Sequence, residues 1–487
     1  MNTLVDNALT FKNSTAKSGE RVTLLGLDFG STTSSALVAS AHIGASATGR
    51  LALDEIKIEH LCEPELTPFI DHAIDIEKIT LLIHDWLKQS GIKLDKIFSG
   101  GSMITGLAAQ ADNANALSQL ITRIMGDSVI ATADDPCLES WLAFMGSCSA
   151  LSRYHADLPI LNFDIGGGTT NVAFGMNGDV IETGCYFIGA RHFQFSPGSY
   201  QITAMSSYGE ALLDALNIHK GINATLSANE CAKIITYYIS ALEAIVLGEH
   251  DFFKLPIAKK HCQVAIHLAS NMQPNITFSG GVGELIYQYI SGDKLPSTTF
   301  FGDFGIDLAK AIVHSPILSA NLKTCVPEHK GRATVVGLTL HSTEISGNTV
   351  YLPKPDCLPL RDLPIIAKLT LNAANGLWHN ALVLAAKRQH GACIQIVDLN
   401  IDTPNQVKLL AQSIRNGLAT SEYPQHQPLV ILLQANIGKA LGNYVSEWGQ
   451  SQVNLIVIDE VALRSAHFVH IGRLHQQMIP VSFFGIH

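Results

Sequence analysis

The sequence contains little charge, and its negative residues outnumber its positive ones. Lys and Arg number 32 against 42 Asp and Glu, which gives a formal net charge of −10, and charged residues make up only 15% of the 487 residues. No run of five like charges occurs. Because nucleic-acid binding usually requires a basic patch, this composition argues against a nucleic-acid partner.

Long apolar runs and paired cysteines are also missing. No apolar run reaches the roughly 18 to 20 residues that span a bilayer, so we expect no transmembrane helix and no membrane partner. The nine cysteines are scattered without a CxxC pair, which suits free thiols in a reducing cytoplasm. Residues 1–20 lack the apolar segment of a signal peptide, and we expect them to form a polar, mobile lead-in to a cytoplasmic protein.

Glycine, in contrast, is concentrated in short stretches that follow apolar runs. In NFDIGGGTTNVAFG (162–175), two apolar strands meet at a turn that contains Asp164 and three consecutive glycines, 166–168. Glycine lets backbone N–H groups approach a ligand, Thr169 adds a hydroxyl group, and Asp164 could hold a cation that accompanies phosphate. Taken alone, the same turn is equally compatible with a hairpin that binds nothing.

A second copy of this pattern lies upstream. TLLGLDFGSTTSSALV (23–38) repeats the order of apolar strand, Asp28, Gly30, a Ser-Thr-Thr cluster and a second apolar strand. An internal repeat with the separation of Asp28 from Asp164 predicts two similar half-domains that face each other across a cleft. Each half would then bring one carboxylate and one hydroxyl-lined hairpin to the same phosphate chain.

A third glycine stretch completes the set. ITFSGGVGELI (276–286) is a strand that runs into Gly280, Gly281 and Gly283 and then into the start of a helix. Glycines at this kind of turn let a phosphate or a flat ring lie against the backbone, with the helix N-terminus directed at it.

The three stretches, in this order, resemble the two phosphate loops and the adenosine loop of the actin, Hsp70 and sugar-kinase superfamily of ATPases. ADDPCLESWLAFMGSCSAL (133–151) and GRATVVGLTLHS (331–342) are similar to the two helices that connect the halves in that superfamily. The resemblance implies an α/β, actin-like ATPase fold of two ribonuclease-H-like halves around a nucleotide cleft.

Within the superfamily, nearly the whole chain resembles the reactivating factors of ethanolamine ammonia-lyase. This similarity rests on LGLDFGSTTSS, on ATADDPCLESWLA before NFDIGGGTTN, on ITFSGGVGELIY and on DEVALRSAHFVHIGRLHQQMIPVSFFG. ITGLAAQADNANAL (104–117) departs from the family pattern, which is richer in charge there. The resemblance implies an ATP-driven chaperone that releases damaged cobalamin from ethanolamine ammonia-lyase in exchange for intact coenzyme. It also implies association with an ethanolamine-utilisation microcompartment, and it leaves a homodimer open.

The resemblance and the composition together predict five segments. A Pro-rich stretch interrupts the chain and is followed by two buried-strand runs that are typical of a small α/β module. The expected segments are a lead-in (1–20), a first actin-like half (21–160), a second half (161–351), a linker (352–364) and a C-terminal α/β module (365–487).

The expected ligands are ATP and Mg²⁺. Asp28 and Asp164 are expected to hold Mg²⁺ through its waters, because Mg²⁺ dehydrates reluctantly. Glu139 on the first connecting helix is the candidate to orient the attacking water, with Asp135 as the alternative. Either acid could instead be a solvated residue at a helix N-terminus. The residues expected to contact the phosphates and the adenosine are Gly30, Ser31, Thr32, Thr33, Gly166, Gly167, Gly168, Thr169, Gly280, Gly281 and Gly283.

Two other functions remain open from the sequence. A metabolite kinase of the same superfamily would need a carboxylate base in the cleft, for which no convincing candidate is found, and an actin-like filament protein is also compatible with the sequence.

Three other short motifs give weaker signals. DFG at 303–305 follows no HRD-type loop, GKA at 438–440 lacks the rest of a P-loop, and His467, His470 and His475 suggest a metal site by spacing alone.

Overall fold

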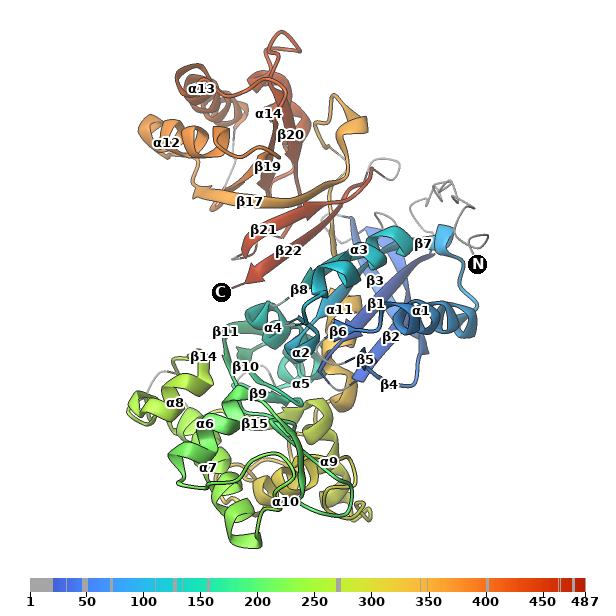
Figure 1. Cartoon of the computed structure of the whole chain (residues 1–487). Coiled ribbons are helices and arrows are strands. Elements are labelled where there is room, and N and C mark those ends of the chain that lie inside the picture. The colour runs from blue at the N-terminus through green and yellow to red at the C-terminus, as the bar shows by residue number, and fades with distance from the viewer. Residues whose placement is uncertain are drawn as a thin grey trace.

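The computed structural model describes residues 21–31, 33–45, 51–70, 73–109, 111–125, 129–133, 135–155, 158–268, 273–341, 343–347, 349–399, 403–462, 464, 466–474 and 478–486. The expected lead-in, Thr32 and His475 lie outside these residues. The chain forms three bodies, each built on one large β-sheet (Figure 1). Among the described residues, no helix combines the length and the apolar character needed to cross a bilayer.

The first sheet has the strand order β3-β2-β1-β7-β8. Its strands β1, β2 and β3 are antiparallel neighbours, whereas β7 and β8 run parallel to β1. The short strand β4 pairs with β2. The strands are β1 (Arg21–Phe29), β2 (Thr33–Ala45), β3 (Leu51–Leu61), β4 (Glu65–Leu66), β7 (Ile97–Ile104) and β8 (Val129–Ala133).

Helices cover both faces of this sheet, because its strands alternate apolar side chains between the two faces. Leu25 and Leu27 of β1 pack against α1 (Ile76–Ser90) and α3 (Ala114–Met125), with the short α2 (Gly106–Ala109) beside them. Leu24 faces the other side and packs against α11 (Ala333–His341). Helix α1 begins at its N-cap Asp75, whose side chain accepts from the Lys78 N–H, and ends at Gly91 in the left-handed conformation.

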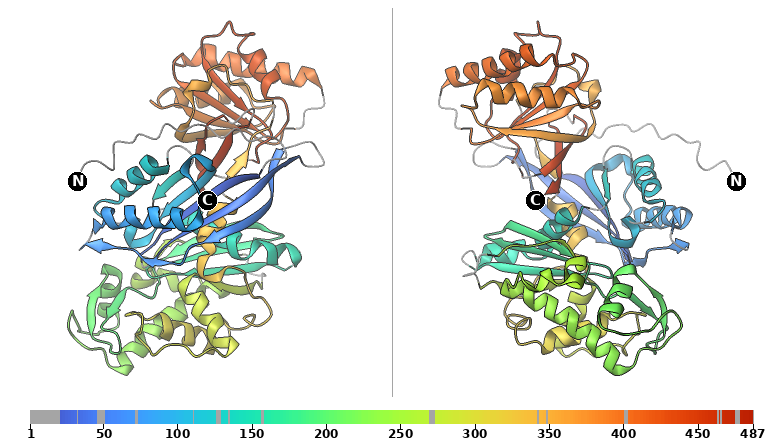
Figure 2. Two further views of the ribbon diagram at one scale, coloured as in Figure 1. Left: turned by 90° about the vertical axis from the view of Figure 1, so that its right-hand side faces the viewer. Right: turned by 60° about the vertical axis from the view of Figure 1, so that its left-hand side comes forward.

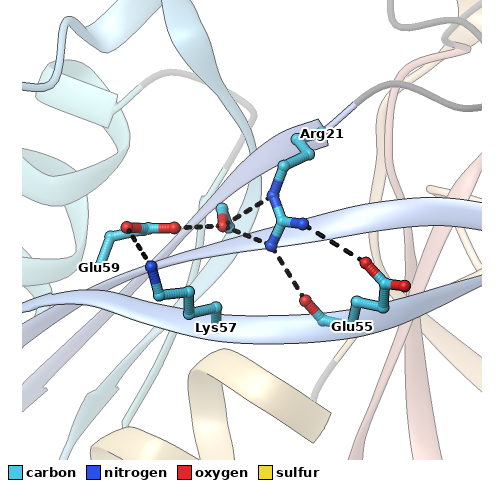
Figure 3. A network of polar contacts seen from close by, with 5 residues as sticks. Arg21, Glu55, Lys57 and Glu59 are labelled. Atoms are coloured by element: carbon cyan, nitrogen blue, oxygen red, sulfur yellow. Dashed lines mark hydrogen bonds and ion pairs between the residues drawn. The ribbon is translucent and has the colours of Figure 1, made fainter.

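The exposed side of strands β1 to β3 carries a network of charged side chains (Figure 3). Arg21 donates hydrogen bonds to Ser40 Oγ and to the carbonyl of Glu55, and it forms an ion pair of 3.6 Å with the Glu55 carboxylate. Ser40 Oγ in turn donates to Glu59, which pairs with Lys57 at 3.7 Å. Since β3 is an edge strand, charges along it disfavour pairing with another chain.

The second sheet repeats a four-stranded part of the first, β3-β2-β1-β7, and places its fifth strand at the opposite edge. Its order is β14-β11-β10-β9-β15, with β9, β10 and β11 antiparallel and β15 parallel to β9. The strands are β9 (Ile160–Ile165), β10 (Thr170–Met176), β11 (Asp179–Tyr186), β14 (Cys262–Val264) and β15 (Asn275–Ser279). Helices α6 (Ser207–Ala215), α7 (Ala228–Leu247), α9 (Gly280–Ser291) and α10 (Gly305–His314) surround it. The two matching sheets confirm the actin-like ATPase fold expected from the sequence.

Two helices pass between the halves and cross each other in backbone contact. They are α4 (Pro136–Ser147), which leads from β8 towards β9, and α11. A Cβ atom at Gly337 of α11 would lie 1.9 Å from the Leu142 carbonyl oxygen, and one at Gly146 of α4 would lie 2.0 Å from that of Ala333. Glycine at these two positions therefore lets the helices approach more closely than any side chain would allow.

The third sheet forms the C-terminal body, drawn at the top of Figure 1 and seen from two further sides in Figure 2. Its order is β16-β22-β21-β17-β18-β19-β20, with β17 to β20 parallel and the other neighbours antiparallel. The strands are β16 (Thr343–Ile345), β17 (Leu360–Leu369), β18 (Ala392–Ile396), β19 (Pro428–Leu433), β20 (Asn454–Ile458), β21 (Ala466–Ile471) and β22 (Pro480–Ile486). Helices α12 (Asn375–Ala386), α13 (Pro404–Ser421) and α14 (Gly438–Val445) cover one face.

The structure differs from the expected boundaries around the Pro-rich segment. Residues 352–364 run into β17 instead of forming a free linker, and Leu358 and Leu363 are buried in a core shared with the first half. Strand β16, expected to end the second half, belongs to the third sheet.

The remaining elements are short. They are β5 (Phe69–Ile70), β6 (Ala73–Ile74), α5 (Ser149–Tyr154), β12 (Phe193–Phe195), β13 (Ile202–Met205), α8 (Pro256–His261) and single 3₁₀ turns at Leu94–Lys96, Phe252–Lys254, Lys330–Arg332 and Pro355–Cys357.

The contact between α4 and α11 generates a stability prediction. Gly337→Ala should lower the free energy of unfolding by about 1–3 kcal/mol, the usual cost of overpacking, although alanine is otherwise the better helix former. Gly376→Ala in α12 is the matched control, because a Cβ atom there meets nothing within 4 Å. Urea unfolding of the two variants would measure the difference, and equal midpoints would contradict the crossing described above.

Candidate functional site

The first strands of the two halves end side by side at one cavity. Asp28 is the penultimate residue of β1 and Asp164 the penultimate residue of β9, so equivalent strands deliver the two carboxylates. Both residues line the cavity. The repeat read from the sequence therefore corresponds to a structural repeat whose two acids meet in space.

The loops after these strands close with the same hydrogen bond. The Gly30 N–H donates to the Thr33 carbonyl at 3.0 Å, and the Gly166 N–H donates to the Thr169 carbonyl at 2.9 Å. Each loop is thus a tight turn of the same form. The Ser31 hydroxyl of the first loop lies 3.4 Å from where a Cβ atom would stand at Gly168 of the second loop, and 2.0 Å from one at Gly106.

The cavity takes in most of the residues that the sequence analysis selected. Ten of the eleven loop glycines, serines and threonines expected to contact the nucleotide lie in the described part of the chain, and nine of these ten line the cavity. The lining residues are Asp28, Gly30, Ser31, Thr33, Ser35, Pro64, Thr105, Gly106, Glu139, Asp164, Gly166, Gly167, Gly168, Thr169, Gly280, Gly281, Gly331, Arg332, Ala333 and Thr334.

Gly283 is the described residue of that set that does not line the cavity. A Cβ atom there would lie 2.9 Å from the backbone carbon of Phe278, so this glycine serves the packing of α9 on β15. Gly280 has φ +77 and lies against the Ile165 carbonyl, whereas Gly281 has open space beside it. The three glycines of one motif therefore have different surroundings.

Three carboxylates share this cavity, and the pKa of each is raised. Burial, with repulsion from Asp164, raises the pKa of Asp28 to about 7. Burial raises the pKa of Asp164 to about 6, although a hydrogen bond from Ser279 opposes the change. Burial, followed by repulsion from Asp28 and Asp164, holds the pKa of Glu139 well above its usual range, and hydrogen bonds from Asn171 and Thr105 lower it in part. The cavity thus brings together three acids whose ionised forms are disfavoured in this environment.

One carboxylate oxygen in this group is unsatisfied. Oδ1 of Asp28 is buried and has no hydrogen-bond partner among the described residues. A buried charged oxygen without a partner is costly, so its environment suits a bound cation.

Asp164 is held by a chain of buried polar side chains that the sequence analysis missed. Ser279 Oγ donates to Asp164 Oδ1 at 2.6 Å, and Asn162 Nδ2 donates to Ser279 Oγ at 2.9 Å. Thr277 Oγ1 completes the chain by donating to Asn162 Oδ1 at 3.0 Å. Asn162, Thr277 and Ser279 are polar residues inside otherwise apolar buried strands, and that departure was the available signal.

Glu139 and Asp135 occupy different positions on α4. Glu139 lines the cavity, whereas Asp135 is the N-cap of the helix and accepts a hydrogen bond of 3.0 Å from the Leu138 N–H. Asp135 is not among the cavity residues. Of the two acids weighed from the sequence, only Glu139 faces the two aspartates.

Arg332 is a basic residue of the cavity that the sequence analysis did not select. Its Nη2 donates to Glu63 at 3.0 Å, which ties the start of α11 to the segment after β3.

Gly189 is a second residue near the cavity that the sequence analysis did not select. A Cβ atom there would lie 2.4 Å from the Gly167 carbonyl, so this glycine lets the following segment pack on the second loop.

A larger cavity of about 660 Å³ adjoins the first, and five residues (Ser31, Gly106, Gly167, Gly168 and Thr169) line both. It is walled partly by Thr67 and Phe69 from the first half and partly by Arg191, His192 and Tyr208 from the second. None of its described lining residues is Asp or Glu.

The structure explains the DFG motif at 303–305 as a turn and gives no support for a metal site at His467 and His470. The Asp303 carboxylate accepts from the Gly305 N–H at 2.8 Å and so forms a turn at the start of α10. His467 and His470 lie on β21. No group of three His, Cys, Asp or Glu side chains in the described part of the chain is arranged to hold a metal ion by direct contacts.

Comparison with known proteins gives consistent matches over most of the length. Ethanolamine ammonia-lyase reactivase EutA of Escherichia coli (strain K12) is 26% identical over 461 residues, which cover 92% of this chain and 94% of the relative. The reactivase EutA of Salmonella typhimurium is 28% identical over 403 residues, 82% of each protein. The crystal structure of an exopolyphosphatase from Cytophaga hutchinsonii matches 66% of this chain and 88% of its own, at 15% identity and a TM-score of 0.32.

The family-level match is wider still. Residues 20–483 match the family described as ethanolamine utilisation protein EutA, a span that includes both halves and the C-terminal body. This chain therefore belongs to the ethanolamine utilisation protein EutA family.

Proposed function

We propose that this chain is an ATP-dependent reactivating factor that acts on ethanolamine ammonia-lyase and promotes exchange of damaged cobalamin for intact coenzyme. The observation that carries the nucleotide part is that two turns of the same form and three carboxylates line a single cavity between matching half-domains. The partner is inferred from the family and from relatives named ethanolamine ammonia-lyase reactivase.

Asp28 and Asp164 are the residues that would hold Mg²⁺. The unpartnered Oδ1 of Asp28 and the raised pKa of both acids fit a site that gains from a cation. Because direct coordination by three such side chains is not found among the described residues, contact through waters of the ion fits better, as Mg²⁺ commonly prefers. When bound there, Mg²⁺ would neutralise charge on the β- and γ-phosphates.

Other residues of the chain would bind the phosphates and orient the attacking water. Backbone N–H groups of the two loops and the hydroxyls of Ser31, Thr33 and Thr169 would donate to phosphate oxygens. Glu139, with its raised pKa, would orient the attacking water and accept its proton. ATP and ADP would favour different closures of the two halves, because a nucleotide shifts such an equilibrium only by binding the states unequally.

The adjoining cavity argues against the metabolite kinase considered above. Such an enzyme would need a carboxylate base beside the acceptor hydroxyl, and the described lining of this cavity offers no Asp or Glu.

The buried acids predict a pH dependence in Mg²⁺-free protein. Asp28 and Asp164 have pKa values near 7 and 6 in the folded state against an ordinary value of 3.8, so between these limits the folded state binds more protons than the unfolded state. Stability contributed by their protonated forms is therefore present at about pH 4 and lost by about pH 7. Asp28→Asn removes the Asp28 part of this dependence, so its melting temperature should rise relative to that of wild type as the pH increases across this window, measured by thermal unfolding.

Mg²⁺ should reverse the advantage in melting temperature that Asp28→Asn has over wild type at pH 7. It should raise the melting temperature of wild type at pH 7 and raise that of Asp28→Asn clearly less, since the variant lacks one of the two carboxylates for the ion. Asp303→Asn is the control, because Asp303 is also a buried acid with a raised pKa but lies outside the cavity. A Mg²⁺ response that disappears in Asp303→Asn and persists in Asp28→Asn would contradict the proposed cation site.

Binding and hydrolysis should separate between two variants. Glu139→Gln keeps the shape of the side chain but cannot accept a proton, so the turnover number should fall by roughly 10²- to 10⁴-fold with little change in nucleotide affinity. Asp164→Ala should instead weaken binding or hydrolysis of Mg²⁺·ATP by about 10- to 100-fold. Calorimetric titration and phosphate release would distinguish the two, and full turnover in Glu139→Gln would remove Glu139 from the mechanism.

The partner is tested with ethanolamine ammonia-lyase inactivated by cyanocobalamin. Adding the chain with Mg²⁺, ATP and intact adenosylcobalamin should restore ammonia release from ethanolamine, and the inactivated lyase should change the rate of ATP turnover. Glu139→Gln should not sustain recovery. Turnover that responds to a small-molecule acceptor would point to a kinase, and light scattering with ATP alone would point to a filament.

A further inference from the structure

Helix α4 connects the nucleotide cavity directly to the C-terminal sheet. Its residue Glu139 lines the cavity, while Leu138 and Leu142, one turn apart on another side, belong to a core built largely from the C-terminal sheet. Val469 of β21 and Phe483 of β22 are part of that same core. A residue that faces the nucleotide and a residue that faces the C-terminal body are therefore neighbours in sequence.

The N-cap of α4 makes a second connection at the same turn. Asp135 uses one oxygen to accept from the Leu138 N–H, and its other oxygen, Oδ2, accepts from the backbone N–H of Gly485 in β22. Gly485 has φ +66, and a Cβ atom there would lie 3.0 Å from His467 Cβ. The last strand thus adopts a conformation that favours glycine at the residue that contacts Asp135.

Arg464 makes a third connection from the C-terminal body. Its guanidinium lies 4.6 Å from the ring centre of Trp141, which follows Glu139 by two residues on α4. The same group donates to Glu344 at 2.7 Å and to the carbonyl of His341, the last residue of α11, at 3.2 Å. Arg464 therefore holds both helices that pass between the halves, and its side chain is only 18% exposed.

We propose that Asp135 is a positioning residue for hydrolysis, which holds the first turn of α4 against β22 and thereby fixes the direction in which Glu139 faces the cavity. The proposal rests on the role of Glu139 given above. In consequence, movement of the C-terminal sheet reaches the nucleotide cavity through Gly485 and Arg464. A displacement of about 1 Å at a reacting group can change a rate by 100-fold, so a small shift of this turn suffices.

Asp135→Ser separates the two roles that the side chain has in the structure. Serine caps helices about as well as aspartate, but its shorter side chain carries one oxygen and cannot serve both Leu138 and Gly485. We expect a melting temperature and nucleotide affinity close to wild type and a turnover number lowered by about 10- to 100-fold. Unchanged turnover would show that Asp135 is a helix cap only and would overturn the proposal.

Asp135→Asn gives a second measurement that does not depend on the serine variant. Asparagine keeps the length and the acceptor for Leu138, but its amide would meet the Gly485 N–H as a second donor, so turnover should fall in the same way. Arg464→Lys should have a smaller effect in the same direction. Arg415→Lys is its control, because Arg415 pairs with Glu447 within the C-terminal body, away from α4, and should leave turnover unchanged.

The double variant Asp135→Ser with Glu139→Gln distinguishes this proposal from the proposed function. If Asp135 acts through Glu139, the serine change should add no further loss of turnover to that of Glu139→Gln. Additive losses would mean that Asp135 acts independently and would overturn the positioning role. Full turnover in the single variant Glu139→Gln would instead refute the proposed mechanism itself.

Discussion

The meeting of three carboxylates in one small cavity is the constraint on which the rest of the structure depends. Asp28, Asp164 and Glu139 come from three separate elements; Asp164 disfavours the ionised form of Asp28, and both aspartates disfavour that of Glu139. Such an arrangement is costly unless a cation or protons compensate it. The matching sheets, the glycine turns and the polar chain behind Asp164 all serve to hold these acids where a ligand can reach them.

The sequence predicted the parts of the site that depend on neighbouring residues. The two Asp-Gly turns were recognisable because strand, carboxylate and glycines lie within a few positions, and their shared hydrogen bond follows from that spacing. Contacts between distant segments were not recognisable. Ser279 reaches Asp164 across 115 positions and Arg332 reaches Glu63 across 269, and no local pattern indicates such pairs.

The Pro-rich segment shows a second limit of local reasoning. Four prolines within 352–364 were taken to indicate a linker, yet Pro364 lies within β17. At this position β17 pairs with β21 on one side, and its pairing with β18 begins only at Ile365. A proline is tolerated where a strand exchanges partners, because its missing N–H is not needed for a continuous ladder. The pairing of strands depends on the whole sheet, so the local sequence around Pro364 does not predict it.

The order of the third sheet has a consequence for how the protein is made. Strand β22 lies between β16 and β21, and β16 directly follows the helix that crosses α4. During synthesis, β16 and the four parallel strands leave the ribosome before β21, the neighbour of β17, and β22, the neighbour of β16. The two actin-like halves can collapse early, but the seam that joins them to the C-terminal body can close only after β22 has been made, and until then its unpaired strand edges are open to chaperones or to neighbouring chains.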